Sequence, residues 1–188
     1  MSAETRITQG GDLGAAKIMG GLGVIFSILA AIPYIGLIFG LAGLILIILA
    51  NKKISEVVGD GSIFSNTWKA MVINFLAVLI GVIVMAAGAA ASQSYYGSGE
   101  GLASFGVILG VVIAYIGYLI SGYLLFKVYK KIAEYFNSDI FKWGAYLILI
   151  GYVLFIILIG AFVAAIGWLL IMVGYFTLPK YYEKVEIG

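Results

Sequence analysis

Apolar residues follow one another along most of this chain in runs that exceed the length of one membrane-spanning helix. The first run, from Ala15 to Ala50, contains a single charged residue, Lys17. As one helix it would be about 54 Å long, whereas the hydrocarbon core of a bilayer is about 30 Å thick. Pro33 lacks the amide hydrogen that a continuous helix requires and disfavours helical geometry in the residue before it. We therefore expect two helices here, at about 15–32 and 35–51.

A second run of double length extends from Trp143 to Leu178. The expected turn within it is Gly160-Ala161, because glycine tolerates a positive φ. This run therefore predicts two more helices, at about 142–159 and 162–178.

Two further apolar segments lie between these runs, at about 69–91 and 102–126. The loop that joins them, 92–101, is rich in Ser, Tyr and Gly. Together the six segments predict an all-α fold, a polytopic transmembrane helical bundle of about six helices. We expect residues 1–188 to form a single transmembrane domain.

The basic residues indicate how this bundle is oriented. With six spans, all 11 of them fall on one side, and the only charge on the other side is Glu100. Basic loops remain in the cytoplasm, so the short tails 1–14 and 179–188 are expected there, in a protein of the cell membrane. A four-span alternative would place lysines on both sides and is disfavoured.

Composition excludes much of the usual chemistry. The chain is 63% hydrophobic and 11% charged, and it contains no Cys and no His. Zinc sites, iron-sulfur clusters and imidazole acid-base catalysis are therefore excluded, and no cofactor is expected. No strongly basic run suggests nucleic acid as a partner.

Two segments on the basic side resemble each other. Lys52-Lys53-Ile54-Ser55-Glu56 precedes Gly59 and Ile63-Phe64, and Lys130-Lys131-Ile132-Ala133-Glu134 precedes Asn137 and Ile140-Phe141. In both, a helix is expected to end at a Gly or Asn in left-handed geometry and to restart after Ser or Asp. The second and third helices, and the fourth and fifth, would then form two similar hairpins flanked by the first and sixth. A diverged duplication and convergence on a good interfacial turn both explain this similarity.

Small residues at regular spacing predict close helix contacts in lipid. The expected packing glycines are Gly36 and Gly40, Gly106 and Gly110, and the heptad series Gly160, Gly167 and Gly174. We expect them to mark seams within one chain, with a homodimer face as the alternative.

The predicted spans contain no ionisable residue at depth, so transport coupled to a buried carboxylate is disfavoured. Neutral polar residues remain, and Asn74, Tyr115, Tyr118 and Tyr152 could combine into a polar seam inside the bundle. Such a seam is expected either to join helices by hydrogen bonds or to line a path for a small solute or a lipid headgroup.

Several short motifs resemble a known family. They are Ile32-Pro33-Tyr34-Ile35-Gly36, Gly43-Leu44-Ile45-Leu46, Ala50-Asn51-Lys52-Lys53-Ile54-Ser55 and Ile63-Phe64-Ser65-Asn66. This run resembles the domain-of-unknown-function 996 family, small multi-pass membrane proteins of archaea and bacteria, most clearly over residues 15–80. The resemblance implies a membrane protein and defines no catalytic or ligand residues to carry over.

The sequence is compatible with two functions. The first is a non-enzymatic scaffold or accessory subunit, whose partners are membrane lipids and other proteins or further copies of the chain. The second is a small transporter or channel for neutral solutes or lipids. A membrane enzyme ranks behind both.

Overall fold

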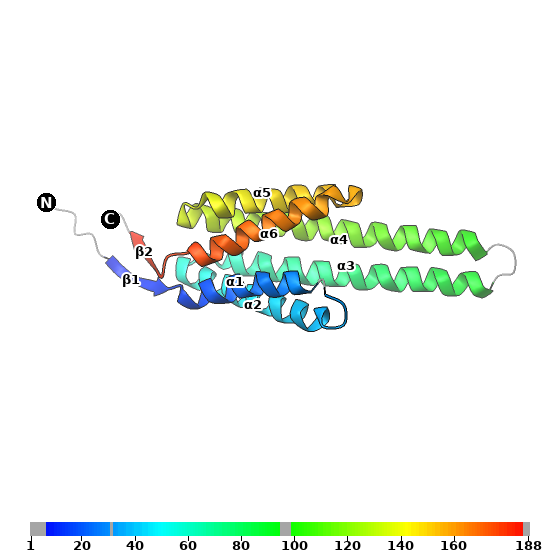
Figure 1. Ribbon diagram of the computed structural model, residues 1–188, viewed down its shortest axis with the longest axis horizontal. Coiled ribbons are helices and arrows are strands. Elements are labelled where there is room, and N and C mark those ends of the chain that lie inside the picture. The colour runs from blue at the N-terminus through cyan, green and yellow to red at the C-terminus, as the bar shows by residue number, and fades with distance from the viewer. Residues whose placement is uncertain (1–6, 31, 95–98, 186–188) are drawn as a thin grey trace. The chain divides into compact units, whose positions relative to one another are not determined.

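The computed structural model describes residues 7–30, 32–94 and 99–185. Within these ranges the chain forms six α-helices, one short 3-10 helix and two strands (Figure 1). In order they are β1 (Ile7–Asp12), α1 (Gly14–Leu29), α2 (Gly36–Val58), α3 (Gly61–Ser94), α4 (Gly99–Phe136), α5 (Asp139–Val153), η1 (Leu154–Ile157), α6 (Ile159–Thr177) and β2 (Tyr181–Val185). The predicted helical bundle is confirmed. The strands are an addition that the sequence did not predict.

The chain divides into two compact units. Unit 1 comprises residues 1–68 and 125–188, and unit 2 comprises residues 69–124. Unit 1 therefore contains α1, α2, α5, α6, both strands, the first turns of α3 and the last turns of α4. Unit 2 contains the remainder of α3 and α4.

In unit 1, α1 contacts both α2 and α6, and α5 contacts α6 (Figure 1). Glycines permit these contacts. A Cβ added at Gly43 on α2 would lie 2.6 Å from the carbonyl oxygen of Gly23 on α1. On α6, a Cβ at Gly167 would lie 2.7 Å from the backbone nitrogen of Ile148 on α5. Because lipid provides no hydrophobic force between helices, such backbone proximity supplies much of the attraction.

The other glycines expected at helix seams also lie against the chain's own atoms. Gly36 and Gly40 face Ala30, and a Cβ added at Gly174 would lie 3.1 Å from the ring of Phe141. Gly160 faces the backbone of Leu154 and the carbonyl oxygen of Gly151.

The break inside the second apolar run lies slightly earlier than expected. The positive φ falls on Leu158, at 59°, and α6 already begins at Ile159. Gly160 is therefore not the turn residue. Its missing side chain instead allows the start of α6 to approach the end of α5.

In the first run, α1 ends at Leu29, and a positive φ of 70° at Tyr34 marks the connection to α2.

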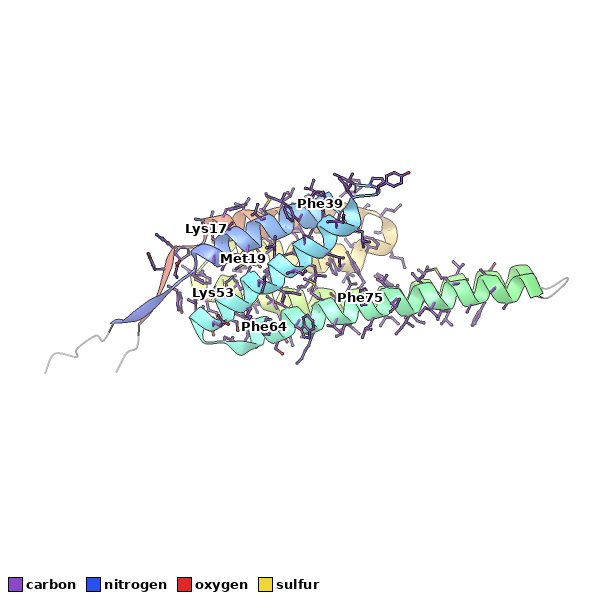
Figure 2. The ribbon with its side chains drawn as sticks, turned by 90° about the horizontal axis from the view of Figure 1, so that it is seen from below. Lys17, Met19, Phe39, Lys53, Phe64 and Phe75 are labelled. Atoms are coloured by element: carbon purple, nitrogen blue, oxygen red, sulfur yellow. The ribbon has the colours of Figure 1, made fainter. Side chains whose placement is uncertain are left out.

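The two chain ends pair with each other. β1 and β2 are antiparallel, with Ile7 opposite Val185 and Asp12 opposite Tyr181. The backbone N–H of Leu13 donates to the carbonyl oxygen of Lys180 at 2.8 Å, which continues the pairing to the start of α1. Lys17 and Lys53 lie toward this end of unit 1, and Phe39 lies toward the opposite end (Figure 2).

Because β1 precedes α1 and β2 follows α6, this pairing places the start of α1 beside the end of α6. Among the described residues, five helices are long and apolar enough to span a membrane. The helix α1 is also apolar but shorter, with 16 residues and a length of about 24 Å.

In unit 2, α3 and α4 form an antiparallel hairpin whose contact surface consists of small residues. A Cβ at Gly110 would lie 2.5 Å from the carbonyl oxygen of Gly81, and a Cβ at Gly106 would lie 2.7 Å from the Cα of Gly88. Gly117 faces Ala77 in the same way. Large side chains of this unit are exposed, among them Phe75, Phe105 and Ile108. The loop expected at 92–101 is shorter than predicted, since α3 continues to Ser94 and α4 starts at Gly99, and residues 95–98 lie outside the described residues.

Candidate functional site

Two similar turns lie at the basic end of unit 1. The turn between α2 and α3 has Gly59 at φ 76°, and the turn between α4 and α5 has Asn137 at φ 46°. The following helices start as predicted from Asp and Ser: the backbone N–H of Ser62 donates to Asp60 Oδ1 at 2.9 Å, and that of Phe141 donates to Ser138 Oγ at 3.5 Å. The predicted left-handed ends are therefore confirmed in both turns.

A polar network joins these two turns. Lys131 Nζ, on α4, donates to Asp60 Oδ2 and to Ser62 Oγ, both at 2.7 Å. The hydroxyl of Tyr135 donates to the same carboxylate at 3.2 Å. The hydrogen bond from Lys131, and after it that from Ser62, holds the pKa of the Asp60 carboxyl well below its usual range. The Asp60 side chain is 15% exposed, whereas that of Lys131 is 40% exposed. The ion pair is thus partly screened by solvent, and its contribution to stability is modest.

A second polar cluster is fully buried. Asn51 on α2 donates from Nδ2 to Thr67 Oγ1 on α3 at 3.0 Å, and Tyr175 on α6 donates from its hydroxyl to Asn51 Oδ1 at 2.6 Å. Thr67 in turn donates to the carbonyl oxygen of Ile63 at 2.8 Å. Asn51, Thr67 and Tyr175 are each 0% exposed. One amide therefore joins three helices through hydrogen bonds that have no water to compete with them.

Tyr129, on α4, completes this cluster from the side. Its ring lies 5.9 Å from that of Trp168 and 6.2 Å from those of Phe141 and Tyr175, measured between centroids. Its hydroxyl is buried and makes no hydrogen bond within the described residues, although Tyr175 and Asn51 lie close beside it. The aromatic contacts thus hold Tyr129 in place beside the polar cluster.

The four residues of the expected polar seam do not lie in one unit. Asn74 on α3 and Tyr115 and Tyr118 on α4 belong to unit 2, whereas Tyr152 on α5 belongs to unit 1. Asn74 Oδ1 is buried and has no hydrogen-bond partner among the described residues. The seam stays a prediction, and a separate buried polar cluster lies at Asn51, Thr67 and Tyr175.

Sequence reasoning missed this buried cluster for a physical reason. Asn51 directly precedes Lys52 and Lys53, and Thr67 directly precedes Trp68, so both positions have the composition of a helix end at the membrane surface. The structure continues α2 to Val58 and begins α3 at Gly61, which places both residues inside helices. The available signal was the helix end predicted at Gly59, eight positions after Asn51.

The arrangement is suited to joining helices. Its buried groups are neutral hydroxyls and one amide, and its charged groups pair with each other at the turns. Within the described part of the chain, no group of three or more acidic, His or Cys side chains is placed to hold a metal ion.

Six apolar helices with internally bonded backbones, closed by paired chain ends, are the architecture of a multi-pass membrane protein. The chain belongs to the family described as protein of unknown function (DUF996), whose sequence model matches residues 39–184. The resemblance inferred from the motifs is confirmed, and the match extends far beyond residues 15–80, where those motifs are clearest.

The chain is also similar to a protein of Methanocaldococcus jannaschii named uncharacterized protein MJ1644. The two are 34% identical over 170 residues, which cover 89% of this chain and 94% of the relative. No solved structure matches the chain. The similarity therefore covers most of the chain.

Proposed function

We propose that this protein is a non-enzymatic scaffold or accessory subunit of a membrane complex, placed in the cell membrane with both tails in the cytoplasm. The observation that supports this best is the buried cluster of Asn51, Thr67 and Tyr175. Its polar atoms bond to one another across α2, α3 and α6, so they hold the helices in place instead of facing a solute. A rigid bundle of this kind is suited to presenting its outer surface to neighbours.

The outer surface supports the same proposal. On unit 2, the large apolar side chains of Phe75, Phe105 and Ile108 are 64%, 64% and 63% exposed. Such side chains contact lipid or the apolar helices of another membrane protein.

The test is cross-linking in the source organism, at native expression level, followed by extraction in a mild detergent and mass spectrometry. A photoreactive amino acid replaces Phe105 in unit 2 in one strain and Phe162, an exposed residue of α6 in unit 1, in another. The scaffold proposal expects one recurrent protein adduct at a fixed stoichiometry from at least one of these positions. Lipid adducts alone from both positions, together with an isolated monomer after extraction, would contradict it.

A transporter or channel for neutral solutes or lipids is the second candidate. The specific observation in its favour is Asn74 Oδ1, a buried acceptor in unit 2 without a partner among the described residues. The protein is reconstituted into liposomes, and flux of labelled neutral solutes and lipid exchange between leaflets are compared with those of the double variant Asn74→Ala, Tyr118→Phe. A flux that this variant abolishes would favour the transporter over the scaffold. An unaffected flux would remove these residues from the path.

A further inference from the structure

The turn between α4 and α5 contains a cavity that neither the bundle's packing nor the polar network uses. Its volume is about 330 Å³. Two lysines, two carboxylates, an amide and a hydroxyl line it: Lys130, Lys142, Glu134, Asp139, Asn137 and Ser138. This volume is within the range of small-molecule sites, and nearly every side chain on its wall can form a hydrogen bond.

The cavity lies where the chain changes from polar to apolar. Directly after Lys142, α5 continues with Trp143 and then an apolar segment. The indole of Trp143 is 62% exposed and its ring centroid lies 6.4 Å from that of Tyr146. Trp143 is thus exposed beside the half-buried Tyr146, and Trp and Tyr side chains at the end of an apolar helix are characteristic of the headgroup layer of a membrane. The cavity therefore opens at the level of lipid headgroups.

The charges on its wall cancel. Lys130 and Lys142 are positive, and Glu134 and Asp139 are negative. The Lys130–Glu134 ion pair is 3.9 Å long, with side chains 47% and 63% exposed, so it is loose enough to rearrange around a ligand. A simple anion would meet two carboxylates here and a simple cation two ammonium groups. A ligand that carries both charges satisfies both pairs.

We propose that this cavity binds the headgroup of a phospholipid that carries both a phosphate and a primary ammonium group. The phosphate is placed between Lys130 and Lys142, beside Ser138 and Asn137, and the ammonium donates to Glu134 and Asp139. Charge-assisted hydrogen bonds of this kind are stronger than neutral ones. The inference is independent of the scaffold proposal, because it concerns what occupies one surface of the bundle and not which protein the bundle serves.

The similar turn between α2 and α3 provides a matched control within the same chain. It has an equivalent ion pair, Lys52–Glu56 at 4.0 Å, with a similarly exposed lysine. After the shared Ile-Phe, however, it has Ser65 where the other copy has Lys142. Its acidic residue, Asp60, is already bonded to Lys131. We expect the specific headgroup site at the α4–α5 turn alone.

Native mass spectrometry of the purified full chain in detergent tests the proposal. The protein is titrated with phosphatidylethanolamine, phosphatidylcholine and phosphatidylglycerol with identical acyl chains. One molecule of phosphatidylethanolamine is expected to bind more tightly than either of the others, because phosphatidylcholine has no N–H donor and phosphatidylglycerol has no cation. Lys142→Gln and Asp139→Asn should each weaken this binding about tenfold, the change that about 1.4 kcal/mol produces. Lys52→Gln should leave it unchanged.

Both variants change exposed side chains, and circular dichroism shows whether the helices remain intact. Equal affinity for all three lipids, or an equal loss with Lys52→Gln, would overturn the proposal. Soluble glycerophosphoethanolamine distinguishes the source of the headgroup. Binding of this compound as tightly as the lipid would assign the cavity to a free phosphate ester and overturn the lipid site.

Discussion

Unit 1 and unit 2 achieve helix contact by different means. In unit 2, α3 and α4 meet through Gly81, Gly106, Gly110 and Gly117, and their outward side chains are large and exposed. In unit 1, glycine contacts of the same kind are supplemented by the buried amide of Asn51 and by the network around Asp60. The comparison shows that both units bring helices together through glycines, and that where three helices of unit 1 meet a buried polar cluster adds to these contacts.

The largest expected effect concerns the close glycine contacts between helices, which both units contain. Gly43→Leu in unit 1 and Gly110→Leu in unit 2 each place a side chain against a backbone carbonyl that cannot move aside, 2.6 Å and 2.5 Å from the added Cβ. We expect each to lower the free energy of unfolding by about 3 kcal/mol, or to prevent folding. Unfolding in mixed micelles with increasing SDS measures this. Gly61→Ala is the control, since nothing lies within 4 Å of a Cβ there, and an equal loss in this variant would contradict the explanation.

The next effect separates the two units. Asn51→Ala removes two interhelical hydrogen bonds and leaves the hydroxyl of Tyr175 buried without its acceptor. Because each hydrogen bond in a membrane contributes about 0.6–2 kcal/mol, we expect the free energy of unfolding to fall by about 2–3 kcal/mol. Asn74→Ala removes an oxygen that has no hydrogen-bond partner among the described residues, so its cost should stay below about 1 kcal/mol. The same SDS titration decides the comparison, and equal losses would show that the two amides have the same role.

A smaller effect tests the cluster within unit 1. Tyr175→Phe removes the 2.6 Å hydrogen bond to Asn51 and should cost about 1 kcal/mol. Tyr129→Phe removes a buried hydroxyl that has no hydrogen bond within the described residues, so stability should stay the same or rise slightly. Both variants keep the aromatic ring. If Tyr129→Phe lost more stability than Tyr175→Phe, the stabilising hydroxyl would be that of Tyr129 and not that of Tyr175.

The smallest expected effect depends on pH. The pKa of Asp60 is lowered in the folded state by Lys131 and Ser62. A carboxylate with a lowered native pKa stabilises the fold above its unfolded pKa of about 3.9, and this contribution is lost as the pH falls below that value. Because the ion pair is partly exposed, we expect at most about 1 kcal/mol. The free energies of unfolding of the wild type and of Asp60→Asn at pH 6 and pH 3 measure this contribution. The difference between the two proteins should shrink at pH 3, and a constant difference would contradict the role of this charge.

Much of the bundle follows from local chemistry in the sequence. The double-length apolar runs predicted where hairpins form, and Gly59 and Asn137 predicted both left-handed helix ends. These features depend on residues adjacent in the chain. The turn before α6 was misplaced because the sequence shows which residue tolerates a positive φ but not which residue must approach a neighbour. Gly160 is used for close approach, and Leu158 adopts the strained angle.

The remaining features depend on contacts between distant residues. β1 and β2 are each short and marginal alone, so neither tail indicated a strand. The hydrogen bonds of Asn51 join it to Thr67 and to Tyr175, the second of which lies 124 positions away. No periodicity in a single sequence reports such a pairing. The candidate seam was inferred from polarity alone, and polarity does not specify which residues meet.

The pairing of the chain ends has a consequence for biosynthesis. The ribosome makes Val185 178 residues after its partner Ile7. At about 5–20 residues per second, the first strand waits on the order of ten seconds or more for the last. During this interval α1 has its neighbour α2 but not α6, so Tyr175 has not yet reached Gly20. Completion of the fold therefore waits until α6 and β2 have been made, and a chain truncated before α6 would remain an open intermediate exposed to membrane proteases.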